Sequence, residues 1–122
     1  WGISFKPDTD DIRESPALTI IKHIIRLGGS VNVYDPVAIQ NARKELYQDV
    51  RHRKRIRFSS SPLAAVAKAD ALLLLTEWSE FKKPNWKNVR KKMHQPNILD
   101  GRNVYSKSEL EKFGFNYISV GR

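Results

Sequence analysis

The sequence predicts an α/β fold, namely a Rossmann-like, doubly wound and mostly parallel sheet of about six strands with helices on both faces. Strand-like and helical stretches alternate along all 122 residues, at spacings of about 25 residues, as βαβ units require. The run "ALLLL" at 71–75 is continuously apolar, which is typical of a central parallel strand. No repeat, low-complexity linker or domain boundary interrupts this order, so a single domain is expected over 1–122.

Strand-like segments are identified by β-branched, aromatic or alternating apolar residues between turn residues. The first begins at residue 1 without any lead-in, which suggests that the sequence belongs to a longer chain. In order, the predicted strands are "WGISF" (1–5), "SVNVYDP" (30–36), the alternating residues 56–58, "ALLLL" (71–75), "NILDG" (97–101) and "NYISVG" (116–121).

Helices are indicated by capping residues and by apolar residues at helical spacing. The Ser-Pro pairs at 15–16 and 61–62 each combine an N-cap with a proline at the first helical position. The first of these helices is expected to end at the glycines 28–29. Further helices are predicted at 37–49, in the basic stretch that ends at Met93, and after Ser106 or Ser108, with Gly114 as the stop.

Composition restricts the classes of function. The net charge is +9 and the pI about 10.0, so the surface attracts polyanions such as nucleic acid, anionic lipid or a phosphorylated ligand. The absence of Cys excludes disulfides, thiolate metal sites and a cysteine nucleophile within these residues, and the three His show no metal-ligand spacing. No apolar run is long enough to span a membrane and no signal peptide opens the chain, so we expect a cytoplasmic protein with no metal.

Three cations are predicted at one edge of the sheet, where parallel strands end and where such folds bind ligands. Lys6 follows the first strand, Arg13 precedes the first helix and Arg102 lies in the turn after the strand at 97–101. Arginine binds phosphate through paired N–H donors and lysine through a point charge, so the three could form a phosphate site. Alternatively, they are surface cations paired with the acids of the same loop, Asp8, Asp10, Asp11 and Glu14.

The turn after the first strand lacks the G-x-G-x-x-G pattern that lets a backbone approach a dinucleotide pyrophosphate. Asp35, at the end of the second strand, resembles the carboxylate that binds ribose in dinucleotide sites. Without the glycines, Asp35 is better explained as a turn residue before Pro36. The sheet is therefore expected to be Rossmann-like without being the primary cofactor domain.

A long and specific pattern, "GISFKPDTDDIRESPALTII", occupies residues 2–21. Together with "VNVYDPVA", "ADALLLLTEWSEF", "ILDGRNVY" and "GFNYISVGR" in the same order, it resembles the C-terminal UDP-binding domain of the UDP-glucose/GDP-mannose dehydrogenase family. The resemblance covers almost the whole chain. Within the family, the sequence looks most like the UDP-glucose 6-dehydrogenases.

The resemblance implies that 1–122 is a single nucleotide-sugar-binding domain, the C-terminal part of a longer, homo-oligomeric oxidoreductase. Such enzymes oxidise UDP-glucose to UDP-glucuronate for polysaccharide biosynthesis, in two NAD-dependent steps through a cysteine thiohemiacetal and thioester. The resemblance also implies that Phe5, Lys6 and Arg102 contact the UDP-sugar substrate, and that Arg13 reaches NAD, which an N-terminal domain mainly binds. Because that domain and the cysteine lie outside this sequence, no catalytic residue is assigned and the chain alone is predicted to be inactive.

Three alternatives stay open at the level of the sequence. The nucleotide sugar could be UDP-N-acetylmannosamine or GDP-mannose, because enzymes for both share these motifs. The tracts "RHRKRIR" (51–57) and "KNVRKKM" (87–93) could instead indicate a nucleic-acid-binding module, although no recognition helix or aromatic platform is evident. The first tract could also form a subunit contact, and Trp1, Trp78 and Trp86 could be exposed aromatics at such a contact or core residues.

Overall fold

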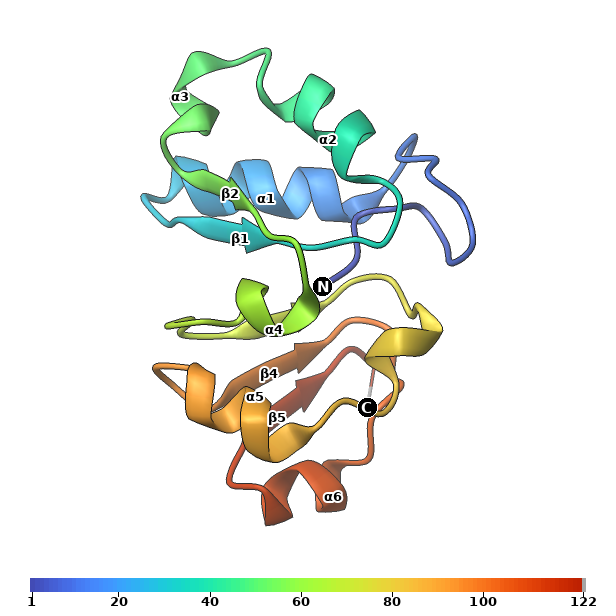
Figure 1. Ribbon diagram of the computed structural model, residues 1–122, viewed down its shortest axis with the longest axis vertical. Coiled ribbons are helices and arrows are strands. Elements are labelled where there is room, and N and C mark those ends of the chain that lie inside the picture. Colours follow the sequence, from blue (N-terminus) through green and yellow to red (C-terminus); the bar gives the residue numbers. More distant parts are fainter. Residues whose placement is uncertain (122) are drawn as a thin grey trace.

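The computed structural model describes residues 1–121 and has the predicted α/β architecture, with every strand pair parallel (Figure 1). The helices are α1 (Pro16–Arg26), α2 (Ile39–Leu46), α3 (Val50–Arg53), α4 (Pro62–Ala65), the 3-10 helix η1 (Ser79–Phe81), α5 (Trp86–Lys92) and α6 (Lys107–Lys112). The strands are β1 (Val31–Val33), β2 (Ile56–Phe58), β3 (Leu72–Leu74), β4 (Asn97–Asp100) and β5 (Asn116–Ser119). The fold class predicted from the sequence is therefore confirmed.

The strands form two parallel ladders, one of β1 and β2 and the other of β3, β4 and β5 in that order. Residues 1–4 lie between the two ladders. The backbone nitrogen of Trp1 donates to Leu73 O, and Trp1 O accepts from Leu75 N, both at 2.9 Å. On the other side, Gly2 N donates to Tyr34 O at 2.9 Å. The spatial order is thus β2, β1, residues 1–4, β3, β4 and β5, which is the order of a doubly wound fold.

Residues 1–5 were predicted to form a strand, and this prediction is wrong in detail because of Gly2. Its φ of +94° interrupts the extended conformation. In a regular strand Trp1 and Ile3 would point to the same face, but here they enter different hydrophobic clusters. A Cβ on Gly2 would lie 2.5 Å from the backbone nitrogen of Thr76, so the close approach also requires glycine.

Two hydrophobic clusters stabilise the two faces of the molecule. In the first, α1 and α2 pack on β1, β2 and Ile3; in the second, α4, α5 and α6 pack on β3, β4 and a group of aromatic rings. Neighbouring residues of one segment enter different clusters, as Leu74 and Leu75 do, because successive side chains of a strand point to opposite faces. Trp86 lies at the centre of the aromatic group and contacts Trp1, Tyr105 and Phe115.

Three details differ from what the sequence suggested. The tryptophans Trp1, Trp78 and Trp86 are all buried, so the suggestion of exposed aromatics is wrong and the core alternative is correct. The short helix α3 was not predicted, because its four residues were grouped with the basic tract. Coverage of the sheet is incomplete, since Leu99 of β4 and Ile118 of β5 are 40% and 64% exposed.

Within residues 1–121, no helix has the length and apolar character needed to cross a lipid bilayer. The same part of the chain holds no group of three or more His, Asp or Glu side chains that could bind a metal ion.

Candidate functional site

The candidate site lies at the edge where the parallel strands end, and three loops contribute to it. Residues 5–14 lead into α1, residues 75–78 follow β3 and residues 101–106 follow β4. Figure 1 shows these loops on one side of the molecule, the right-hand side of the view. Doubly wound folds bind their ligands at this edge, where the sequence also predicted the candidate residues.

Asp35 fixes the beginning of the loop at 5–14. The carboxylate is buried; Oδ2 accepts from Ile3 N at 2.8 Å, from Ser4 N at 3.0 Å and from the Ser4 hydroxyl at 3.1 Å. Oδ1 accepts from the amides of Val37 and Ala38 at the turn before α2. Burial opposes ionisation, but these hydrogen bonds outweigh it and lower the pKa of Asp35 below its usual range. The explanation of Asp35 as a turn residue is therefore correct.

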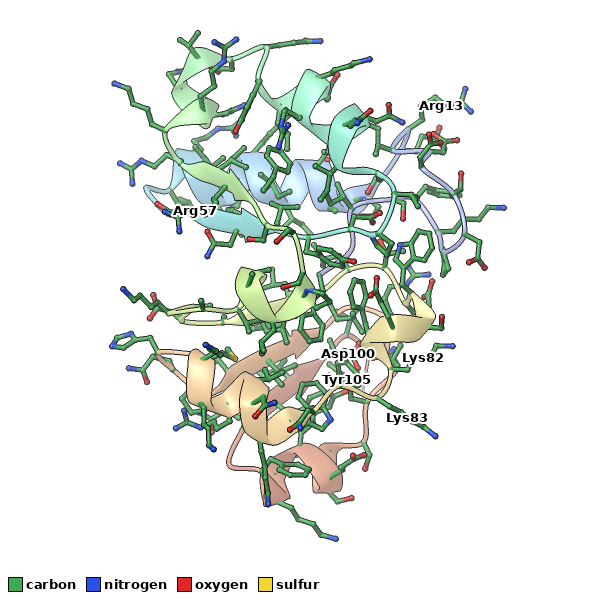
Figure 2. All side chains as sticks on the ribbon, viewed as in Figure 1. Arg13, Arg57, Lys82, Lys83, Asp100 and Tyr105 are labelled. Atoms are coloured by element: carbon green, nitrogen blue, oxygen red, sulfur yellow. The ribbon has the colours of Figure 1, made fainter. Side chains whose placement is uncertain are left out.

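Asp100 plays the same part for the loop that carries Arg102. Its buried Oδ1 accepts from Arg102 N at 3.0 Å, and Oδ2 accepts from Val104 N, Tyr105 N and the Tyr117 hydroxyl, each at 2.8 Å. Figure 2 shows Asp100 and Tyr105 next to each other inside the molecule. Burial again opposes ionisation, but the hydrogen bonds prevail and lower the pKa of Asp100. The position of the Arg102 backbone is thus fixed from within the core.

Ser4 joins the first loop to the loop after β3. Its hydroxyl accepts from the indole nitrogen of Trp78 at 3.0 Å, and its carbonyl accepts from the Thr76 hydroxyl at 2.7 Å. All three residues are buried. Buried polar groups that are fully hydrogen-bonded hold one geometry, so the two loops keep a fixed relative position.

Phe5 and Lys6 begin the exposed part of the first loop. Phe5 N donates to Asp11 O at 2.7 Å, which closes the loop on itself, while the Phe5 side chain stays 46% exposed. Lys6 is exposed as well. Asp8 has a φ of 65°, a left-handed conformation that Asp tolerates better than most residues. The loop therefore presents an aromatic ring and an ammonium group to solvent.

Arg13 forms the ion pair that the alternative interpretation of this loop anticipated. Its Nε and one terminal nitrogen donate to the two Asp11 oxygens at 3.0 and 2.9 Å. These hydrogen bonds, helped by the charge of Lys6, lower the pKa of Asp11 to about 2. The Arg13 side chain is nevertheless 87% exposed, so the pair lies at the outer surface of the loop.

Arg102 is oriented by a carboxylate from another loop. Its Nε donates to Oε2 of Glu77 at 2.5 Å, and the two side chains are 40% and 24% exposed. Among the described residues, the terminal nitrogens of Arg102 make no hydrogen bond, so they are available to a ligand. Sequence reasoning missed Glu77, although its position two residues after the apolar strand at 71–75 was a usable signal.

The structure separates the three predicted cations into two groups. Lys6 and Arg102 belong to loops that Ser4 and Glu77 join through the segment after β3. Arg13 lies at the far end of its loop, close to α2, where Asn41 donates to Asp10 O at 3.0 Å. Figure 2 shows Arg13 well away from Asp100.

The fold and its polar edge define a Rossmann-like ligand-binding domain, and comparison with known proteins specifies which one. The family described as "UDP-glucose/GDP-mannose dehydrogenase family, UDP binding domain" matches residues 1–107. The chain belongs to this family.

Relatives and solved structures agree with this assignment. The UDP-glucose 6-dehydrogenase of Pseudomonas aeruginosa is 40% identical to this chain over 122 residues. The UDP-glucose 6-dehydrogenase TuaD of Bacillus subtilis is 40% identical to it over 121 residues. These matches cover 100% and 99% of the chain but only 27% and 25% of the relatives, so the chain spans about a quarter of their length. The structure of a UDP-D-ManNAc dehydrogenase from Pyrococcus horikoshii matches 99% of this chain and 24% of its own, with 30% identity and a TM-score of 0.70.

Proposed function

We propose that this chain is the nucleotide-sugar-binding domain of an NAD-dependent UDP-glucose 6-dehydrogenase that oxidises UDP-glucose to UDP-glucuronate in the cytoplasm. The observation that carries the proposal is Arg102, held by Glu77 with its terminal nitrogens free, in a loop network shared with Phe5 and Lys6. The printed names of the P. aeruginosa and B. subtilis relatives favour UDP-glucose over UDP-N-acetylmannosamine or GDP-mannose.

The three substrate residues have complementary roles in this proposal. Arg102 binds the diphosphate through its two terminal nitrogens, and Lys6 adds a point charge to the same anion. Phe5 offers an exposed apolar ring against the uridine or the sugar. Binding energy from the nucleotide then holds the sugar in position for a reaction that other domains carry out.

Arg13 is the candidate contact to NAD, which accepts the hydride when it is bound. Its exposed guanidinium keeps one terminal nitrogen without a hydrogen bond among residues 1–121, so it fits an anionic group of a ligand held by another domain. The sequence lacks G-x-G-x-x-G after its first segment, which favours an auxiliary rather than a primary role of this domain in binding NAD.

The whole enzyme in this proposal is longer than the chain and forms a homo-oligomer, with residues 1–122 as its C-terminal domain. The quarter-length coverage of the relatives supports the greater length of the enzyme. Since the sequence contains no Cys to carry the thiohemiacetal, the chain alone should not reduce NAD in the presence of UDP-glucose.

The test is a spectrophotometric assay of NAD reduction by the longer protein that carries this chain. UDP-glucose should support turnover, whereas UDP-N-acetylmannosamine and GDP-mannose should support far less. Arg102→Ala should raise KM for UDP-glucose, while Arg57→Ala, an exposed arginine of β2, should leave KM unchanged. Turnover with GDP-mannose but not with UDP-glucose would overturn the choice of substrate.

A further inference from the structure

A basic cavity lies at the opposite end of α1 from the loop at 5–14. It has a volume of about 550 Å³. Figure 1 shows α3, above the C-terminal end of α1, on the side of the molecule opposite that loop. The residues that line it come from α1, the end of α2, α3 and the segments on either side of α3, namely Lys22, Ile25, Arg26, Glu45, Gln48, Asp49, Arg51, His52 and Arg55.

The charge of this lining is positive. Four lysine or arginine side chains face two carboxylates, which leaves a net charge of +2 with His52 neutral. A concave surface with one dominant sign of charge focuses the potential and attracts ions of the opposite sign. The lining contains no Phe, Tyr or Trp on which a nucleic-acid base could stack. A ligand of this cavity is therefore recognised by its negative charge.

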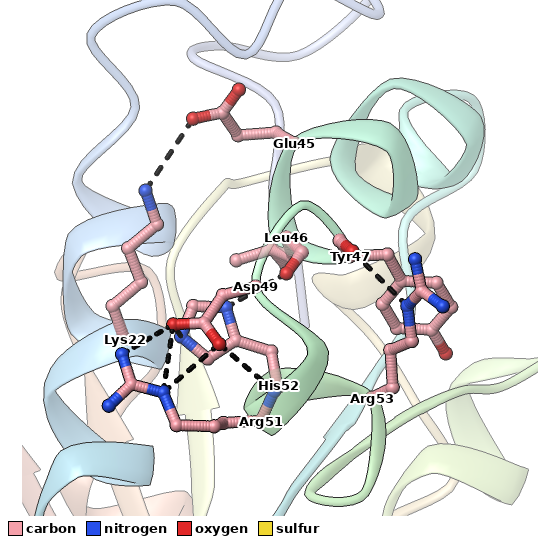
Figure 3. Close-up of polar contacts among 8 residues, drawn as sticks. All are labelled: Lys22, Glu45, Leu46, Tyr47, Asp49, Arg51, His52 and Arg53. Atoms are coloured by element: carbon pink, nitrogen blue, oxygen red, sulfur yellow. Dashed lines mark hydrogen bonds and ion pairs between the residues drawn. The ribbon is translucent and has the colours of Figure 1, made fainter.

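The two carboxylates are already occupied by neighbouring cations, as Figure 3 shows. Asp49 accepts from Nε of Arg51 at 3.1 Å and from a terminal nitrogen of Arg51 at 2.7 Å. Glu45 lies 3.5 Å from the ammonium of Lys22. The imidazole of His52 is largely buried; its Nδ1 donates to Leu46 O at 2.8 Å and its Nε2 is 3.8 Å from Asp49. The walls of the cavity are thus set by local contacts before any ligand binds.

Arg26 and Arg55 supply the charge that is not balanced. Within residues 1–121, neither has a carboxylate within the 4.0 Å limit of an ion pair. One terminal nitrogen of Arg55 donates to Gly28 O at 2.9 Å, which fixes the side chain against the end of α1 with a neutral partner. Both guanidinium groups are exposed and retain N–H donors for a ligand.

We propose that this cavity binds the phosphate groups of a small molecule that carries at least two phosphates, with Arg26 and Arg55 as its principal contacts. Arginine suits this chemistry because its planar N–H donors match phosphate oxygens in pairs. The cations converge on a cavity of small-molecule size, within the ~300–1,000 Å³ common for ligand pockets. The site lies at the opposite end of α1 from Lys6, so it does not depend on the proposed UDP-sugar site.

The test is a titration of the isotope-labelled protein with inorganic tripolyphosphate, followed by amide NMR shifts at about 0.15 M salt. We expect saturable shifts at the amides of Arg26, Arg51 and Arg55, and these shifts should be unchanged in Arg102→Ala, which removes a phosphate contact of the proposed UDP-sugar site. Arg26→Gln and Arg55→Gln should each weaken binding about tenfold. The matched control is Arg57→Gln, an exposed arginine on β2 outside the cavity, which should change the affinity less than about twofold. The amide spectrum itself reports whether each variant is folded.

Equal weakening by all three substitutions would overturn the proposal, because it would indicate general attraction to a basic surface. Shifts that spread equally to Lys87 and Lys91 on α5 would have the same meaning. A random DNA duplex is tested at the same salt concentration. If it binds, and if Arg57→Gln and Arg26→Gln weaken its binding equally, the basic surface is assigned to nucleic acid instead.

Discussion

Glu77 and Arg102 come from the loops after two adjacent strands, and the Glu77 carboxylate accepts the Nε–H of Arg102 at 2.5 Å. This pair leaves the outer side of the guanidinium without a partner among the described residues. The arrangement is preorganised for an anion, because the side chain has already lost its rotamer freedom when the ligand arrives.

Removing either of the two cationic side chains proposed to bind the substrate should weaken nucleotide-sugar binding without unfolding the protein. Lys6→Ala and Arg102→Ala should each lower the affinity for UDP-glucose by about tenfold or more, as expected for charge-assisted phosphate contacts. Calorimetric titration measures the affinity and circular dichroism checks the fold. Arg57→Ala serves as the control for loss of an exposed arginine elsewhere. If both substitutions left the affinity unchanged, the assignment of these residues would be wrong.

Asp35→Asn should strongly destabilise the fold. One oxygen of the carboxylate would become an NH2 group, which cannot accept hydrogen bonds, so either the amides of Ile3 and Ser4 or those of Val37 and Ala38 would lose their acceptor. Leaving buried donors unsatisfied costs about 2–4 kcal/mol in the free energy of unfolding, measured by urea denaturation. The matched control is Asp70→Asn, whose side chain is 79% exposed and which should change stability by less than about 1 kcal/mol. Equal effects of the two substitutions would contradict the structural role of Asp35.

Stability should fall in acid because Asp35 and Asp100 have folded-state pKa values below their usual range. A carboxylate of this kind contributes stability that is fully present above the unfolded pKa of about 3.9. That contribution is lost as the pH falls through the lower folded pKa. Asp11, with a pKa of about 2, acts in the same direction. Urea denaturation between pH 3 and 7 should show this loss of stability below about pH 4. The free energy of unfolding should depend less steeply on pH in Asp35→Asn, and an unchanged dependence would contradict the lowered pKa of Asp35.

Gly2→Ala should cost more stability than Gly28→Ala, although both glycines have nearly the same backbone angle, with φ of +94° and +95°. The shared left-handed conformation costs an alanine about 1–2 kcal/mol at either position. Only at Gly2 would the new Cβ also meet the backbone of Thr76 at 2.5 Å, whereas nothing lies within 4 Å at Gly28. Thermal and urea denaturation of the two variants should separate the steric from the conformational effect. Equal losses of stability would contradict the steric effect, because they would show that the backbone of Thr76 can move away from a Cβ at residue 2.

Local chemistry made several elements predictable from the sequence. The hydroxyls of Ser15 and Ser61 accept from backbone amides at the starts of α1 and α4, as the Ser-Pro pairs indicated. Gly28 adopts the left-handed conformation just after the end of α1, as expected for a helix-ending glycine. Capping and turn signals depend on a few adjacent residues, so they can be recognised without knowing the tertiary structure.

Features that depend on distant residues were not predictable in the same way. Gly2 breaks the first strand because Thr76 approaches it, and the sequence alone does not bring these residues together. Burial of Trp1 similarly depends on Phe81 and Trp86. Arg102 was identified as a candidate, but its partner Glu77 lies 25 residues away in the sequence. The edge of the sheet could therefore be predicted, whereas the contacts that orient its side chains could not.

Calorimetric titration of the protein with UDP-glucose tests the central claim most directly, with UDP, GDP and a random DNA duplex as controls at low and physiological salt. The proposed function predicts saturable binding of UDP-glucose and UDP at both salt concentrations, much weaker binding of GDP, and an affinity for UDP-glucose that falls about tenfold or more in Arg102→Ala. Heat released by the duplex alone, or equal binding of UDP and GDP that Arg102→Ala does not affect, would contradict it.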